Sequence, residues 1–289
     1  MSQITQVRSG SRLVSYIFLT VASFLWLLPT IGLFIVSFRE STESQTNGWW
    51  TALTTLSVDN WTLSSYRTVF DGANLGNSFI SSFAVTLPAT VLPLLFAAYA
   101  AYGFTFIKFK GREAIFSVLI GLLVVPLQAA LVPILKMFLA FTARTGIEIS
   151  GQFAAAWFVH SAFAMPLAVY ILRNYMMSIP VALIEAARVD GASNYKIFWR
   201  LVLPISVPAL ASFAIFQFLW VWNDYLIAFV YVGNDRPVLT YVLLSMLGQR
   251  GEGWQTVAAG SFVSMSVPLL IFFSLQRYFI RGLTAGSVK

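Results

Sequence analysis

Six long apolar stretches alternate with shorter polar segments along the 289-residue chain. A helix needs about 20 mostly apolar residues to cross the hydrocarbon core of a bilayer, and each stretch reaches that length. Arg8 and Arg12 precede the first stretch, which is too long for a signal peptide, and no small-x-small cleavage site follows it. The pattern predicts an all-α membrane protein with six transmembrane helices, at Leu13–Phe38, Phe79–Phe104, Ala114–Phe141, Gln152–Leu172, Ile205–Tyr231 and Thr256–Ile280.

The composition agrees with lipid as the main solvent of the chain. Apolar residues make up 58% and charged residues only 10%, against about 45–50% and about 25% in soluble domains. With no Cys and only His160 as a histidine, the sequence offers no thiol nucleophile and no His-His metal pair. We therefore expect no metal and no cofactor on this chain, and charges this sparse do not favour a nucleic-acid partner.

The distribution of charge predicts which way the helices run. Six spans place both termini on one side, and the segments on that side hold 12 Lys and Arg against 3 acidic residues. The opposite segments hold 5 Lys and Arg against 7 acidic residues. By the positive-inside rule both termini are cytoplasmic. The expected organisation is a cytoplasmic N-terminus at 1–12, a six-span domain at 13–281 and a cytoplasmic tail at 282–289, with outer loops at 39–78 and 232–255.

The inner connection at 178–204 has its own local pattern. Pro180 suits the first turn of a helix, with Ser178 nearby as a candidate cap. The dipeptide Asp190-Gly191 supplies a turn in which glycine can take a positive φ. Ser193 or Asn194 can cap a second helix that runs to about Val202. The sequence predicts two short helices joined by a sharp bend on the cytoplasmic face.

The spacing within this connection resembles the EAA loop of bacterial ABC importer permeases. Glu185-Ala186-Ala187 is followed after three residues by Gly191, and after nine more by Leu201, one residue and Leu203-Pro204. The family pattern usually has Ile at the position of Leu201. The resemblance implies the type I ABC importer permease fold, with the loop's first helix docking on a separate ATPase. The residues that would couple the two subunits are Glu185, Ala186, Ala187, Asp190, Gly191, Leu203 and Pro204.

The resemblance also implies partners. The chain has no G-x-x-x-x-G-K-S/T phosphate loop, so ATP and Mg²⁺ belong on the ATPase. We expect two copies of that ATPase, a second homologous permease subunit, an extracytoplasmic sugar-binding protein and contact with membrane lipid. The chain itself is then not an enzyme, and it resides in the inner, or cytoplasmic, membrane of a prokaryote.

Two further motifs are similar to the maltose-type carbohydrate importers. They are W-V-W-N-D-Y at residues 220–225 and R-G-L-T-A-G-S-V-K at residues 281–289. The match is to the shorter of the two maltose-type permeases, and to permeases for α-glucosides. It implies that the tail residues Gly282, Leu283, Thr284, Ala285 and Gly286 reach toward the ATPase. It also implies that the outer loop enters the binding protein through Gly248, Gln249, Arg250, Gly251 and Gly253.

The fifth span carries the candidate translocation path. An isolated carboxylate such as Asp224 is costly within a membrane and is a functional hypothesis by default. Gln217, Asn223 and Asp224 could line a polar path, with Trp220 or Tyr225 offering faces to sugar rings. The alternative is a structural hydrogen bond from Asp224 to a neighbouring helix through Lys136. His160 is expected to be a satisfied core group.

Other functions remain open from sequence alone. An ABC permease for a non-sugar solute would share the EAA loop, and a self-contained secondary transporter would share the six spans. An intramembrane enzyme lacks support, because the spans hold no Cys, no His pair and no carboxylate dyad.

Overall fold

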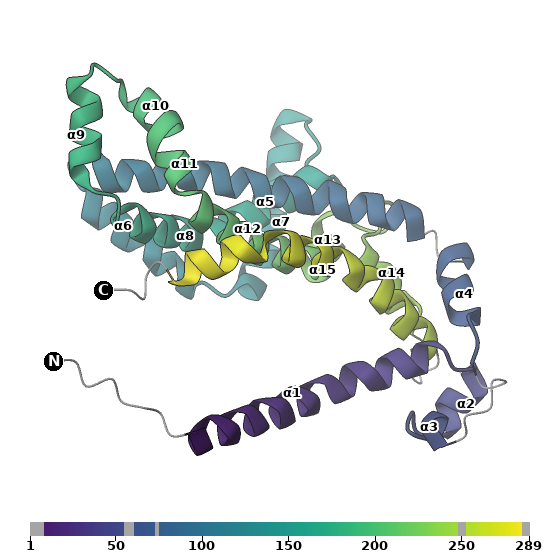
Figure 1. Ribbon diagram of the computed structural model, residues 1–289. Coiled ribbons are helices and arrows are strands. Elements are labelled where there is room, and N and C mark those ends of the chain that lie inside the picture. Colours follow the sequence, from purple (N-terminus) through teal and green to yellow (C-terminus); the bar gives the residue numbers. More distant parts are fainter. Residues whose placement is uncertain (1–8, 55–60, 73–74, 248–252, 285–289) are drawn as a thin grey trace. The chain divides into compact units, whose positions relative to one another are not determined.

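The computed structural model describes residues 9–54, 61–72, 75–247 and 253–284, with the backbone alone at 9–12, 45, 72 and 278–284. Every regular element in these ranges is helical, as expected (Figure 1). The chain divides into two compact units. The first unit spans residues 1–74 and 243–263, and the second spans residues 75–242 and 264–289.

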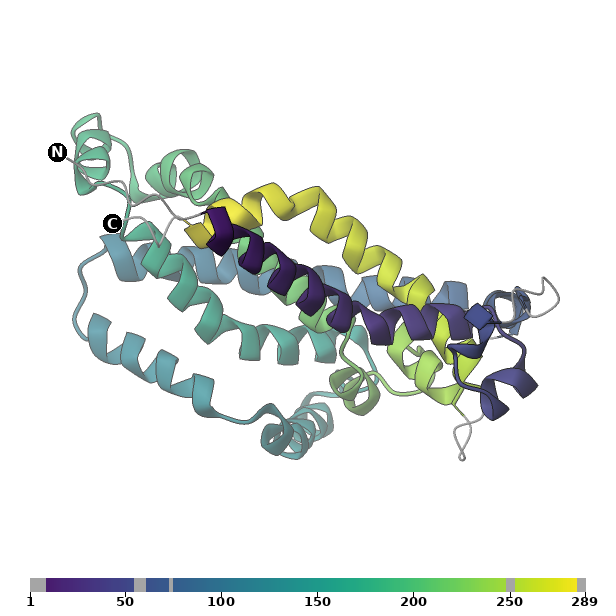
Figure 2. The ribbon, with the colours of Figure 1, turned by 60° about the horizontal axis from the view of Figure 1, so that its bottom comes forward.

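Three long helices form the centre of the second unit. They are α5 (Leu75–Phe106), α8 (Phe153–Met176) and α12 (Val207–Trp222), which pack against one another (Figures 1 and 2). Small residues make the contact close, since Ala97, Ala101 and Ala168 are fully buried. Small side chains let helix backbones approach in membranes, where no hydrophobic force drives helices together.

The predicted third span is not one helix. The chain forms α6 (Arg112–Gly121), a short 3₁₀ turn at Leu122–Val124 and α7 (Leu127–Thr145). Pro126 stands at the start of α7, and Val125 before it is extended with ψ of 116°. A proline lacks the N–H that would continue the first helix, and it disfavours the helical conformation of the residue before it. The expectation of one continuous helix over Ala114–Phe141 was wrong for this reason.

The predicted fifth span is both bent and broken. The segment Asn194–Ile205 meets α12 at an angle of 72°, where Ser206 precedes Val207-Pro208 at the start of α12. Beyond Trp222 the helix stops at residues 223–225 and resumes as α13 (Leu226–Tyr231). The span Ile205–Tyr231 is therefore interrupted inside its apolar run, and α14 (Leu239–Ser245) follows it.

The first unit contains α1 (Ser9–Ser37), α2 (Ser41–Thr46), α3 (Thr51–Thr54) and α4 (Ser64–Gly72), together with the first residues of α15 (Trp254–Thr284). Arg39, only 2% exposed, holds the segment after α1 together. Its guanidinium group donates to Glu43 Oε2, Thr51 Oγ1 and the carbonyl oxygens of Asn47 and Gly48. The planar fork of arginine suits several acceptors at once.

Five of the described helices are long and apolar enough to cross a membrane, and the bent pair around Ser206 makes a sixth. The six are α1, α5, α7, α8, the bent pair and α15. This number agrees with the six spans predicted from the apolar stretches.

Candidate functional site

The inner connection folds as a helix, a turn and a second helix. Helix α9 spans Val181–Val189, and Asp190 is its C-cap. Gly191 then takes φ of +77°, and α10 (Asn194–Ile197) follows. Ser193 caps α10, because its Oγ accepts a hydrogen bond from the amide of Lys196 at 3.3 Å. We call residues 181–197 the knuckle. Figure 1 shows it projecting at the end of α5.

Two local expectations for the knuckle need adjustment. Ser178 does not cap α9, because its hydroxyl donates to the carbonyl of Tyr175 instead, and Pro180 occupies the cap position. The second helix continues past α10 through a π-helical turn at Phe198–Val202 and the short α11 (Leu203–Ile205). Leu203 and Pro204 therefore lie at the junction with the bent fifth span.

One face of the knuckle is anchored to the helices of the second unit. Ile184 is 1% exposed and packs in the apolar core that contains Tyr102 and Phe198. Arg188 Nη2 donates to the carbonyl of Phe106, the last residue of α5, at 3.2 Å. Tyr102 of α5 donates to Asn194 Oδ1 at 3.3 Å. A displacement of the knuckle would therefore be passed directly to α5.

The opposite face of the knuckle is exposed and carries the predicted coupling residues. Glu185, Ala186 and Asp190 are exposed and Ala187 is half-buried. Glu185 forms no salt bridge with any of the residues that the structure describes. The sequence reasoning missed Val189, which is 87% exposed, and Tyr195, which is 64% exposed. Exposed apolar residues beside an unpaired carboxylate are typical of a docking surface.

The five residues proposed for the translocation path do not come together. Gln217 and Trp220 line an open apolar cavity with Phe163 and Phe216, and Gln217 also donates to the carbonyl of Ala89 at 3.0 Å. The Asn223 side chain donates to the carbonyl of Leu219, one turn earlier.

Asp224 stabilises the helix that follows it. Its Oδ2 accepts hydrogen bonds from the amides of Ile227 at 2.9 Å and Ala228 at 3.2 Å, so it satisfies the free amides at the start of α13. Its own carbonyl accepts a bond from Thr240 Oγ1 at 2.8 Å. Asp224 is thus a capping residue, and the suggested partner Lys136 is not among its hydrogen-bond or salt-bridge partners.

Replacing Asp224 with leucine should destabilise the protein, whereas asparagine should be tolerated. Asparagine keeps an oxygen that can accept the two amide bonds, and loss of such a cap costs about 1 kcal/mol. For a protein of this size we expect the melting temperature to fall by about 2–4 °C in Asp224→Leu. Thermal unfolding of the detergent-purified protein measures this. An equal loss in Asp224→Asn would show that the charge, not the cap, is what matters.

His160 is buried without the hydrogen bonds expected of a core histidine. The residue is 0% exposed, and neither ring nitrogen finds a partner among the described residues. Its Nε2 lies 3.8 Å from Asp224 Oδ2, and its ring stands edge-on to Trp220. His160 and Asp224 share a small cavity with Ser82 and Thr86, and its size is near the lower limit for one water molecule. The expectation of a satisfied histidine was wrong in its hydrogen bonding but right in its burial.

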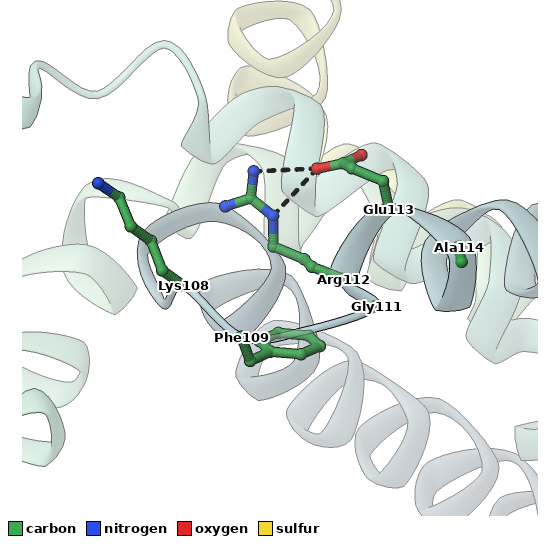
Figure 3. A pocket seen from close by; sticks show the side chains of 6 residues that line it. All are labelled: Lys108, Phe109, Gly111, Arg112, Glu113 and Ala114. Atoms are coloured by element: carbon green, nitrogen blue, oxygen red, sulfur yellow. Dashed lines mark hydrogen bonds and ion pairs between the residues drawn. The ribbon is translucent and has the colours of Figure 1, made fainter.

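The basic turn between α5 and α6 forms a second open cavity, lined by Lys108, Phe109 and Arg112 (Figure 3). Arg112 pairs with Glu113 at 2.9 Å. Glu113 is also bound by Arg173 of α8, whose guanidinium lies over the Phe116 ring. These contacts fasten α6 to α8, so we assign them a structural role.

Several predicted site residues lie outside the described part of the chain. They are Gly248, Gln249, Arg250 and Gly251 in the outer loop, and Ala285 and Gly286 in the tail. Gly282, Leu283 and Thr284 form the last turn of α15. Gly253 has φ of +88°, and a Cβ there would lie 2.7 Å from the Met246 carbonyl oxygen. This glycine is therefore required by the backbone, whatever the loop contacts.

Residues 89–285 match the family described as "Binding-protein-dependent transport system inner membrane component". The chain belongs to this family. As a member, it is the non-catalytic membrane subunit of a transporter, and ATP hydrolysis takes place on a partner. The ABC importer permease fold expected from the EAA spacing is confirmed.

Relatives of this permease extend over most of its length. The osmoprotective compounds uptake permease protein GgtD of Synechocystis sp. is 47% identical over 94% of this chain and 90% of its own. The alpha-glucoside transport system permease protein AglG of Rhizobium meliloti is 48% identical over 79% of this chain and 60% of its own. A solved bacterial ABC transporter involved in alginate import superposes with a TM-score of 0.71 at 21% identity, covering 96% of this chain and 100% of that one. At that identity the superposition supports the fold alone.

Proposed function

We propose that this permease is one of two membrane subunits of an ATP-driven importer for a small carbohydrate, such as an α-glucoside or another di- or oligosaccharide. An extracytoplasmic binding protein delivers the sugar, and two copies of a partner ATPase bind ATP and Mg²⁺. The relative AglG, which is 48% identical and is named an alpha-glucoside permease, supports a substrate of this class. The charge distribution supports cytoplasmic termini, which places the knuckle on the side where ATP is available.

The observation that carries the proposal is the construction of the knuckle. Its exposed face offers Glu185 and the small Ala186 to a partner, Ala187 is half-buried beside them, and its inner face is bonded to the end of α5. Closure of the paired ATPases would push the knuckle and tilt the attached helices as rigid bodies, which alternates access to the two sides of the membrane. A self-contained secondary transporter would need no such surface.

A second candidate substrate class has its own support. GgtD carries the name of an uptake permease for osmoprotective compounds, and an ABC permease for a non-sugar solute would use the same knuckle. The partner permease and the binding protein can hold much of the specificity, so this chain is compatible with both classes.

The test is ATP hydrolysis by the complete transporter in nanodiscs. The permease is purified together with its partner permease, ATPase and binding protein, and the binding protein is loaded with α-glucosides, oligosaccharides or osmoprotective compounds in turn. We expect α-glucoside-loaded binding protein to stimulate hydrolysis at least severalfold over the unloaded protein. Stimulation only by non-sugar osmoprotectants would replace the carbohydrate assignment with the second candidate. Ion-driven uptake by the purified chain alone would contradict the ABC mechanism.

A further inference from the structure

Three aromatic rings gather where the fifth span is broken. Tyr225 lies in the break, Phe229 is one turn later on α13, and Tyr241 is on α14. The ring planes are nearly parallel, at 16° between Tyr225 and Phe229, 9° between Tyr225 and Tyr241, and 14° between Phe229 and Tyr241. The corresponding centroid separations are 5.4, 6.1 and 6.0 Å.

These separations exclude a single column of stacked rings. In a column, the first and third rings would be about twice as far apart as neighbours, whereas here all three separations are similar. Such separations between parallel rings are those of offset stacking, so the rings form a stepped triangle. Phe229 is 44% exposed and the two tyrosines are half-buried, so Phe229 is the ring most open to an occupant.

Hydrogen bonds hold the segments that carry the three rings. Asp224 caps α13 and so sets the orientation of Tyr225 and Phe229. Thr240, next to Tyr241, donates to the Asp224 carbonyl, and the amide of Leu239 donates to Ser82 of α5 at 2.8 Å. Groups that are fixed before a ligand arrives avoid the entropy cost of ordering them on binding.

We infer that Tyr225, Phe229 and Tyr241 form a platform on which a pyranose ring of the transported sugar stacks. The inference rests on the proposed carbohydrate function. The C–H face of a pyranose is apolar and flat enough to lie on aromatic faces, and its hydroxyl groups need polar partners at the edge. Two tyrosine hydroxyls and the exposed Asn223 belong to the same region of the chain. Asp224 is then a positioning residue rather than a sugar contact.

An aromatic belt at the membrane interface explains these rings less well. Belt residues anchor singly, each at the level of the headgroups, and need no common orientation. Here the break before α13 and the start of α14 are joined by a hydrogen bond, and the three rings that they carry lie nearly parallel. A second alternative is that the partner permease covers the rings. The test distinguishes the sugar platform from membrane anchoring and from a subunit interface.

The test measures sugar transported per ATP hydrolysed in proteoliposomes that contain the complete transporter. The variant Phe229→Leu keeps an apolar side chain and removes the ring, whereas Phe229→Tyr keeps the ring. The control is Phe158→Leu, which removes a 62% exposed ring from α8. Because the substitution removes one stacking face, we expect Phe229→Leu to lower sugar per ATP about fivefold, which corresponds to about 1 kcal/mol. Phe229→Tyr and Phe158→Leu should match the wild type.

The first measurement is the stimulation of ATP hydrolysis by sugar-loaded binding protein in the wild-type transporter. If this stimulation is absent, the proposed carbohydrate function is wrong, whatever the variants do. With that stimulation present, a wild-type ratio in Phe229→Leu overturns the platform alone. Equal losses in Phe229→Leu and Phe158→Leu would indicate anchoring in lipid and would also overturn it. Loss of the second permease when the Phe229→Leu transporter is purified would also overturn the platform, because the rings would then form a subunit interface.

Discussion

Replacing Gly191 with proline should abolish sugar uptake while leaving the permease inserted in the membrane. Gly191 takes φ of +77° and donates its amide hydrogen to the carbonyl of Arg188 at 3.0 Å. Proline is held near φ of about −65° and has no amide hydrogen, so the angle between α9 and α10 cannot be kept. The coupling surface would then no longer present its residues in one geometry. We expect uptake in proteoliposomes to fall by more than about tenfold, and hydrolysis of ATP to lose its stimulation by loaded binding protein.

Two milder substitutions at Gly191 separate backbone strain from crowding. A Cβ at this position meets no atom within 4 Å, so any effect of a small side chain comes from φ alone. Asparagine tolerates the left-handed region better than alanine, for which that conformation costs about 1–2 kcal/mol. The expected order of uptake is wild type, Gly191→Asn, Gly191→Ala and Gly191→Pro. Wild-type uptake in Gly191→Pro would refute the role of the bend.

Reversing the charge of Glu185 should weaken the association with the ATPase. The carboxylate is exposed on α9, and the structure pairs it with no described basic residue. A basic group on the partner would donate a charge-assisted hydrogen bond to this carboxylate, and such a bond is worth about 1.5–3 kcal/mol. We therefore expect Glu185→Lys to reduce affinity for the ATPase about 10- to 100-fold. Titration of labelled ATPase onto the permease pair in nanodiscs measures the dissociation constant.

The matched control for Glu185→Lys is Glu148→Lys. Glu148 is an exposed residue in the connection between α7 and α8, so the control makes the same change of net charge at a distant position. Glu185→Gln should fall between wild type and Glu185→Lys, because a neutral amide removes the attraction without adding repulsion. Equal losses in Glu148→Lys and Glu185→Lys would show a general charge effect instead of docking.

The long spans and the knuckle were predictable because their signals are local. A run of 20 or so apolar residues is enough to require a helix in lipid, and it needs no information from other segments. The turn at Gly191 and the Ser193 cap likewise depend on neighbours only a few residues away. Pro126 also carried a local signal that is typical of a kink, but the apolar run continues on both sides, so the run alone did not show that one helix ends there and another begins.

Other features could not be read from the sequence because they depend on a backbone path or a packing arrangement that only the folded chain has. Burial of Arg39 follows from acceptors gathered by the fold. Lys136 was the suggested partner of Asp224 in the structural alternative, but the amides of α13 are its partners instead, because the folded chain interrupts the helix at residues 223–225. His160 lies in a small cavity with Ser82, Thr86 and Asp224, yet neither of its ring nitrogens makes a hydrogen bond with the described residues, and periodicity alone does not reveal this grouping.

By itself, the sequence determined that the chain spans a membrane, how many spans it has, and where the two short helices at 181–197 lie. The length of an apolar run and the residues of a turn or cap are local signals, so they need no information from distant segments. Only the tertiary structure decided which face of those helices is free, where Asp224 directs its carboxylate and how Tyr225, Phe229 and Tyr241 become parallel. The free face of those helices and the position of Tyr241 depend on contacts between segments that are distant along the chain, and such contacts exist only once the helices have packed. The Asp224 carboxylate binds amides only three and four residues away, and it can do so because the folded chain interrupts the helix at residues 223–225.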